Sequence, residues 1–224
     1  MKSLEVVAID GPSGAGKSTI AKAVALRLGW RHLDTGAMYR AVTVWFADHD
    51  VDLDDGAAVG RALASLHLRL GEYGRVWIGE QEVTDRLRTR AVERAVSAVS
   101  ARASVRDAMR DLQRAQARLG PLVAEGRDMT SVVFPDARYK FFVDAHAQER
   151  ARRRLADFEA SGRGGMCLED VLSELETRDR SDSTRDVAPL IRVPEAVYLD
   201  TTDLTVDEVV TRIVDLVEAE SGGR

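Results

Sequence analysis

The residues of this chain with the clearest chemical signature lie between positions 11 and 19. Their spacing fits G-x-x-x-x-G-K-[ST], in which glycines let successive backbone N–H groups point at a phosphate. The β-branched run Val6–Ile9 precedes this stretch and the helical pattern Ile20–Leu28 follows it, as such a loop requires. We therefore predict a loop that binds nucleotide phosphates, formed by Gly11, Pro12, Ser13, Gly14, Ala15, Gly16, Lys17, Ser18 and Thr19.

Two side chains of this loop have expected chemical roles. The Lys17 ammonium group would reach the β- and γ-phosphates, and the Ser18 hydroxyl would ligate Mg²⁺. The helix that begins here adds its positive dipole end to the same site. The other interpretation, a chance glycine-rich turn, does not account for the flanking strand and helix.

Further polar residues follow two other predicted strands. Tyr39 and Arg40 lie one turn beyond Asp34–Gly36, and Arg127 and Asp128 come shortly after the predicted strand Leu122–Glu125. Ligands of open α/β sheets bind beyond the carboxyl ends of the strands, so these residues are expected beside the phosphate loop. Arginines facing a polyphosphate indicate a second anionic substrate, with surface salt bridges as the alternative. The Asp128 carboxylate would pair with an arginine or accept from an amino group of a base.

Two arginine-rich segments lie further along the chain. Arg178–Arg185 has almost no apolar residue and follows a helix predicted for Leu168–Thr177, so we expect a loop. Such a loop is equally consistent with a solvated connector and with a mobile lid that brings arginines to the transferred phosphoryl group. Arg150–Arg154 lies on a predicted helix, and a solvated basic face is the preferred interpretation over a phosphate contact.

The remaining patterns predict the fold class. Short apolar strands alternate with helices, which indicates an α/β fold with a parallel sheet flanked by helices. A small antiparallel unit, Leu66–Leu70 with Arg75–Ile78, is expected as an insert. We expect helix N-caps at Thr35, at Ser104 and at Thr205. The other expected strands are Trp30–Asp34, Leu122–Glu125, Tyr139–Asp144 and Ala196–Asp200.

Composition limits the possible partners and location. The net charge of −5 and the pI of about 5.5 argue against a broad nucleic-acid-binding face. With Cys167 as the only cysteine, no intrachain disulfide can form, and no apolar run approaches a membrane span of ~18 residues. We expect a cytoplasmic monomer without a signal peptide. The chain contains no asparagine, which excludes the N-K-x-D guanine-binding motif of GTPase switches.

Several motifs together resemble bacterial cytidylate kinase. They are D-G-P-S-G-A-G-K-S-T at 10–19, D-T-G-A-M-Y-R at 34–40, E-G-R-D-M at 125–129, V-V-F-P-D-A at 132–137 and R-D-x-x-D-S-x-R at 178–185. The resemblance runs from residue 6 to about residue 215. It implies a nucleoside monophosphate kinase fold of the P-loop NTPase type, with a five-stranded parallel sheet. It also implies ATP-dependent phosphorylation of CMP and dCMP to CDP and dCDP, with Mg²⁺.

The resemblance also implies roles for individual residues. The cytosine would be read by Ser97, Arg106 and Asp128, and the CMP phosphate would be held by Arg40 and Arg127, with Thr35 and Tyr39 nearby. Arg178, Asp182 and Arg185 would belong to the lid. Catalysis would come from Lys17, Arg127, Arg178 and Arg185 through positioning and charge stabilisation, because the attacking phosphate oxygen is already ionised.

The implied organisation has three parts. The core would comprise 1–35, 120–177 and 193–224, the monophosphate-binding insert 36–119 and the lid 178–192. Thr130 stands where the family often has glycine, which bears on the backbone approach after Met129 but leaves the Arg127–Asp128 pair in place. Alternatives are a kinase for another nucleoside monophosphate or small anionic acceptor, and a non-catalytic nucleotide-binding module.

Overall fold

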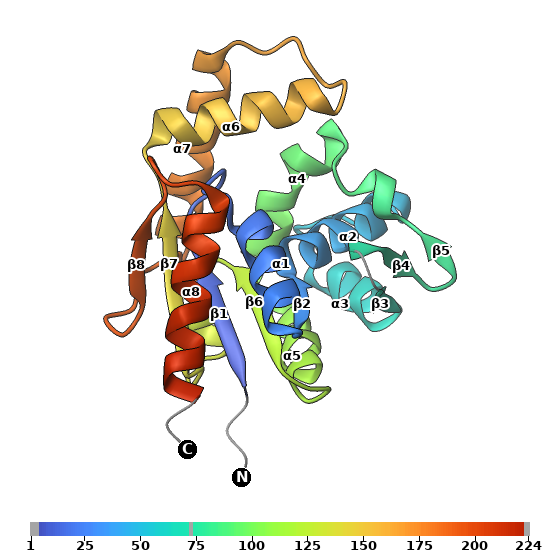
Figure 1. Cartoon of the computed structure of the whole chain (residues 1–224). Helices are drawn as coiled ribbons and strands as arrows, with labels where there is room; N and C mark the ends of the chain where they lie inside the picture. The colour runs from blue at the N-terminus through green and yellow to red at the C-terminus, as the bar shows by residue number, and fades with distance from the viewer. Residues whose placement is uncertain (1–4, 72–73, 222–224) are drawn as a thin grey trace. The chain divides into compact units, whose positions relative to one another are not determined.

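A computed structural model describes residues 5–71 and 74–221. Residues 1–4, at which the sequence predicts no signal peptide, lie outside the described part. The chain divides into two compact units, residues 1–33 with 116–224 and residues 34–115. We call them the core unit and the insert unit. Figure 1 labels their helices and strands.

Strands and helices alternate along much of the chain. In chain order they are β1 (Val6–Asp10), α1 (Lys17–Leu28), β2 (Arg31–Asp34), α2 (Thr35–Asp48), α3 (Gly56–Ala64), β3 (Leu68–Leu70), β4 (Val76–Ile78), β5 (Gln81–Glu82), the 3₁₀ turn η2 (Thr84–Arg86), α4 (Arg90–Ala101), α5 (Ala103–Ala117), β6 (Leu122–Gly126), the π-helical turn η3 (Met129–Val133), β7 (Tyr139–Asp144), α6 (Ala147–Ala160), α7 (Leu168–Thr184), β8 (Val197–Asp200) and α8 (Val206–Ser221).

The core unit is built on the predicted five-stranded sheet. Its strand order is β2-β6-β1-β7-β8, and β1 pairs in parallel with both β6 and β7. The central strands are buried because their β-branched and small residues face packed layers on both sides. On one face, Val24 of α1 and Ile213 of α8 pack against Ile9 and Phe141 in one apolar cluster. Figure 1 shows these two helices next to each other over the sheet.

The insert unit contains the predicted antiparallel strands. β3 pairs with β4, and β4 pairs with a third strand, β5. The sequence did not indicate β5, because Gln81 and Glu82 are both polar and exposed and form a strand of only two residues. Val76 and Ile78 turn their side chains inward and share a cluster with Val44 of α2.

Two of the three expected N-caps are wrong. The N-cap of α2 is Asp34, not Thr35: the Asp34 carboxylate accepts from the backbone N–H of Ala37 at 2.9 Å. A carboxylate is the stronger acceptor for an unpaired N–H at the positive end of a helix. Ser104 lies inside α5, which begins at Ala103 because Arg102, in extended conformation, ends α4 directly before it.

The third expected cap is confirmed. The Thr205 hydroxyl accepts from the N–H of Glu208 at 3.3 Å, and the Glu208 carboxylate accepts from the N–H of Thr205 at 2.8 Å. This reciprocal capping box satisfies two backbone donors at the start of α8.

The polar segment after Thr177 is helical, which corrects the expectation of a loop. α7 runs without a break to Thr184, and its N-cap position is the exposed Cys167. Its first half packs on α6 through Val171 and Leu175. Its second half is held by ion pairs with distant residues, and composition alone does not reveal such partners.

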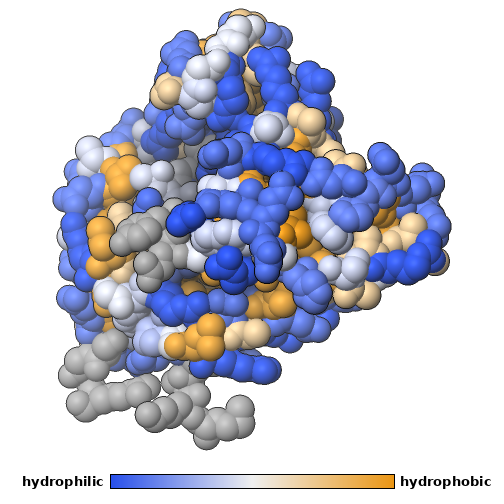
Figure 2. All heavy atoms as spheres, turned by 90° about the vertical axis from the view of Figure 1, so that its right-hand side faces the viewer, coloured by the Kyte–Doolittle hydropathy of each residue, from blue (hydrophilic) through white to orange (hydrophobic). Residues whose placement is uncertain are grey.

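Figure 2 shows one face of the molecule, on which hydrophilic residues predominate and hydrophobic residues form separate small patches. Within residues 5–71 and 74–221, no helix is long and apolar enough to cross a membrane.

Candidate active site

The phosphate loop connects β1 to α1, as the sequence predicted. Gly11 has a φ of 151°, and a Cβ at this position would lie 1.9 Å from the carbonyl oxygen of Val143. Only glycine allows the loop to leave β1 this close to β7. Gly16 adopts a φ of 84° at the N-cap of α1, which starts at Lys17. Ser18 and Thr19 follow and are exposed, so their hydroxyls are accessible to a ligand.

Lys17 is buried, with only 5% of its surface exposed. Its Nζ donates to the carbonyl oxygen of Pro12 at 2.6 Å. Burial lowers the pKa of Lys17 to about 7, and the positive charge of Arg127 acts in the same direction, whereas Glu125 and Asp10 oppose it. The ammonium group is therefore short of negative charge, which a nucleotide phosphate would supply.

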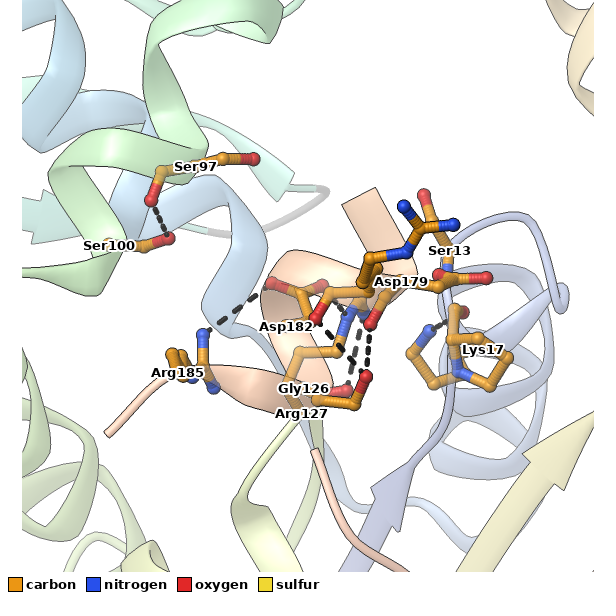
Figure 3. A network of polar contacts seen from close by, with 12 residues as sticks. Ser13, Lys17, Ser97, Ser100, Gly126, Arg127, Asp179, Asp182 and Arg185 are labelled. Atoms are coloured by element: carbon orange, nitrogen blue, oxygen red, sulfur yellow. Dashed lines mark hydrogen bonds and ion pairs between the residues drawn. The ribbon is translucent and has the colours of Figure 1, made fainter. Parts of the chain in front are cut away.

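An aspartate of α7 holds two of the predicted arginines in the core unit (Figure 3). The Asp182 carboxylate accepts from Arg127 Nε at 2.8 Å, and its other oxygen lies 3.6 Å from Arg185 Nη1. Burial alone would raise the pKa of Asp182, but the charge of Arg127, with that of Arg178, holds it below its usual value. Asp182 is thus an ionised carboxylate shared among guanidinium groups.

A second aspartate of α7 contacts the phosphate loop itself. The Asp179 carboxylate accepts from the backbone N–H of Ser13 at 3.1 Å (Figure 3). Its other oxygen accepts from Arg150, whose Nη1 also donates to the carbonyl oxygen of Ser13 at 2.8 Å. Arg150 is 7% exposed, so the expectation of a solvated basic face is wrong for this residue. The Asp179 carboxylate therefore accepts a hydrogen bond from a backbone N–H of the phosphate loop, a group of the type that binds phosphate.

The loop after β6 presents the other predicted acceptor residue of the core unit. Asp128 is buried and directly precedes η3, and its backbone carbonyl accepts from the N–H groups of Val132 and Val133 at the end of that turn. The following peptide groups donate to Asp10, a fully buried carboxylate at the end of β1.

The insert unit carries the remaining predicted residues. Arg40 Nε donates to Glu93 at 3.2 Å, and its guanidinium lies over Gly36, where an added Cβ would be 2.8 Å from Nη1. The side chain of Arg40 therefore comes close to the backbone at Gly36. Arg106 is buried and lies over the ring of Tyr39 at 5.2 Å.

The other predicted residues of the insert unit lie on its helices, where Arg106 and Ser97 are linked through Ser100. The Arg106 Nη1 group donates to the carbonyl oxygen of Ser100 at 3.0 Å, and Ser100 Oγ donates to the carbonyl oxygen of Ser97 (Figure 3). Thr35 is buried at the first position of α2. The structure thus gathers Lys17, Arg127, Arg178, Asp182 and Arg185 within the core unit, and Tyr39 with Arg106 within the insert unit.

Sequence reasoning did not assign roles to Asp10, Glu93, Arg150 or Asp179. A carboxylate at the end of a buried strand was a usable signal for Asp10, because parallel sheets bind ligands at that edge. Glu93 gave no comparable signal, since glutamate on a helix is ordinarily exposed.

Comparison with known proteins gives consistent results. The cytidylate kinase family model matches residues 7–219. A cytidylate kinase of Exiguobacterium sibiricum is 46% identical over 97% of this chain and 98% of its own length. A cytidylate kinase of Geobacter sulfurreducens is 44% identical over 95% of this chain and 92% of its own.

Solved structures agree on the fold. A shikimate kinase from Bacteroides thetaiotaomicron superposes with a TM-score of 0.50 at 15% identity, covering 95% of this chain and 98% of that protein. TT1252 from Thermus thermophilus gives the same TM-score at 19% identity, covering 98% of both chains.

Proposed function

The chain belongs to the cytidylate kinase family, and we propose that it transfers the γ-phosphoryl group of ATP to CMP or dCMP, forming CDP or dCDP. The observation that carries this proposal is the buried Lys17 of the phosphate loop, close to the Arg127–Asp182–Arg185 cluster, in a chain matched along nearly its whole length. The reaction class is phosphoryl transfer to a phosphate acceptor.

The donor side is the phosphate loop. Backbone N–H groups of Gly11–Thr19 would cradle the ATP phosphates, and Lys17 would exchange the Pro12 carbonyl for phosphate oxygens. Ser18 is exposed directly after Lys17, so its hydroxyl fits a Mg²⁺ ion that arrives with ATP. When bound, Mg²⁺ would neutralise charge developing on the β- and γ-phosphate oxygens.

The acceptor side would use arginines and an aspartate. Arg127 and Arg40 would hold the CMP phosphate, each exchanging a carboxylate partner, Asp182 or Glu93, for phosphate oxygens. The Asp128 carboxylate would accept from the cytosine amino group, with Arg106 and Ser97 completing base recognition. Thr35 and Tyr39 would line the same subsite.

Transfer itself needs little chemistry from the protein. The CMP phosphate oxygen is already ionised, so the enzyme has to align it with the γ-phosphorus and stabilise the transferred group. Lys17, Arg127, Arg178 and Arg185 would supply that positive charge. Closure of the lid, which we place at 178–192 between core segments 120–177 and 193–224, would exclude water from the site.

A coupled assay of ADP release tests the proposal. With ATP and Mg²⁺, we expect kcat/KM to be highest for CMP and dCMP and much lower for UMP and AMP. Lys17→Ala, in a folded protein, should lose activity by orders of magnitude. Equal rates with all four acceptors, or ATP binding without any acceptor-dependent ADP release, would contradict it.

We further propose that the enzyme is a monomer and that it is located in the cytoplasm. Light scattering after size-exclusion chromatography would test the first of these proposals, and cell fractionation would test the second.

A further inference from the structure

Asp10 is a buried charged group to which the proposed reaction gives no role. Its side chain has no exposed surface, and it is the last residue of β1. One carboxylate oxygen accepts from the N–H of Met129 at 2.8 Å. The other accepts from the N–H and the hydroxyl of Thr130, each at 2.7 Å.

These three hydrogen bonds close a small loop at the carboxyl edge of the sheet. Asp10 stands in register with Gly126 across the β1–β6 pair. The chain then passes through Arg127 and Asp128 and returns to Asp10 at Thr130. Arg127 and Asp128 therefore lie on a segment that is fixed at both ends to β1.

The same carboxylate belongs to the residue that precedes the phosphate loop. Gly11 lies so close to β7 that a Cβ there would overlap the carbonyl oxygen of Val143. Asp10 thus ties the loop bearing Arg127 and Asp128 to the point where the phosphate loop begins. Errors of about 1 Å between reacting groups can cost ~10²-fold in rate, so such a connection has consequences for turnover.

Thr130 contributes the only side-chain donor among the three hydrogen bonds. It is 1% exposed, so no water replaces its hydroxyl if that group is removed. Burial raises the pKa of Asp10 to about 6, and the hydrogen bonds from Thr130 and Met129 act against that rise. The hydroxyl thereby favours the charged, bond-accepting form of the carboxylate.

We propose that Asp10 and Thr130 are positioning residues for the acceptor nucleotide, and that their hydrogen bonds hold Arg127 and Asp128 in the geometry that binds CMP. This inference rests on the proposed function. It also gives a purpose to the threonine found where the resemblance led us to expect glycine. The side chain adds a third donor to Asp10 at the position where a glycine could offer only its N–H group.

Four variants test the proposal in the full-length enzyme. Thr130→Val keeps the side-chain shape and removes the hydroxyl, and we expect kcat/KM for CMP to fall about tenfold or more. The KM for ATP should stay within about twofold, because the phosphate loop keeps its own contacts. Thr130→Ser restores the hydroxyl and should recover most of the loss. If Thr130→Val does not fold, Thr130→Ala supplies the same comparison.

Ser131→Ala is the matched control. Within the described part of the chain, Ser131 Oγ is buried and has no hydrogen-bond partner, so its removal should leave both KM values unchanged. Unchanged CMP kinetics in Thr130→Val would overturn the proposal, as would equal losses toward CMP and ATP or a serine variant no better than valine. The proposed function fails separately, if the wild-type enzyme itself shows no CMP-dependent ADP release.

Discussion

Neutralising Asp182 should destabilise the ligand-free enzyme strongly. Its carboxylate lies 2.8 Å from Arg127 Nε and 3.6 Å from Arg185 Nη1. At an effective dielectric constant of about 20, these attractions are roughly 6 and 5 kcal/mol before desolvation is subtracted. Removing one partner of a buried ion pair costs about 3–5 kcal/mol in net terms. For a chain of this size, Asp182→Asn should therefore lower the melting temperature by about 6–20 °C.

The assay is thermal unfolding with and without sulfate. An anion can replace the missing negative charge between Arg127 and Arg185, so sulfate should raise the melting temperature of Asp182→Asn more than that of the wild type. Asp186→Asn is the matched control, since Asp186 is exposed and the charge change is identical. Its melting temperature should stay close to the wild-type value.

The pH dependence gives an independent check. The pKa of Asp182 is held below its ordinary value of 3.8 in the folded protein, with Arg127 as the main opposing charge to burial. Its stabilisation is therefore present above pH 3.8 and is lost as the pH falls through the lowered pKa. The difference in melting temperature between the wild type and Asp182→Asn should therefore become smaller in that acidic range. A variant as stable as Asp186→Asn at neutral pH, with the same response to sulfate, would refute this reasoning.

Three further predictions concern the phosphate loop and one helix end. Because the pKa of Lys17 is lowered to about 7, phosphate binding should raise it, and calorimetry in buffers of different ionisation enthalpy should show uptake of about one proton on ATP binding at pH 8 and little at pH 6; equal uptake at both would contradict it. Asp179→Asn should tighten ATP binding when no acceptor nucleotide is present, because the negative charge that competes with phosphate for the N–H of Ser13 is removed. Weaker ATP binding by this variant in calorimetry would count against this prediction. Thr205→Ala should lower the melting temperature by about 2–4 °C through loss of the Glu208 capping box, and an unchanged thermal transition would exclude that contribution.

Local patterns predicted the individual strands and helices of the sheet layers, the phosphate loop and the cap at Thr205, because each depends on neighbours within a few residues. The features that the sequence did not reveal depend on partners far along the chain. Asp182 meets Arg127 across 55 positions, and Asp10 meets Thr130 across 120. Polar composition therefore suggested a loop at the end of α7, although ion pairs fix that segment as a helix.

Because α7 is one continuous helix, a rotation at one point of it moves the residues further along. Asp179 and Asp182 lie on the same continuous helix as Val171 and Leu175, which pack on α6, and Asp182 is about seven to eleven residues beyond that contact, a span of ~10–16 Å. A pivot of about 10° at this contact would move Asp182 by ~2–3 Å, more than a hydrogen bond can stretch. The carboxylates of Asp179 and Asp182 would then lose their hydrogen bonds to Ser13 and Arg127 together. A fluorophore on the single thiol of the chain, Cys167 at the opposite end of α7, would report such a rotation.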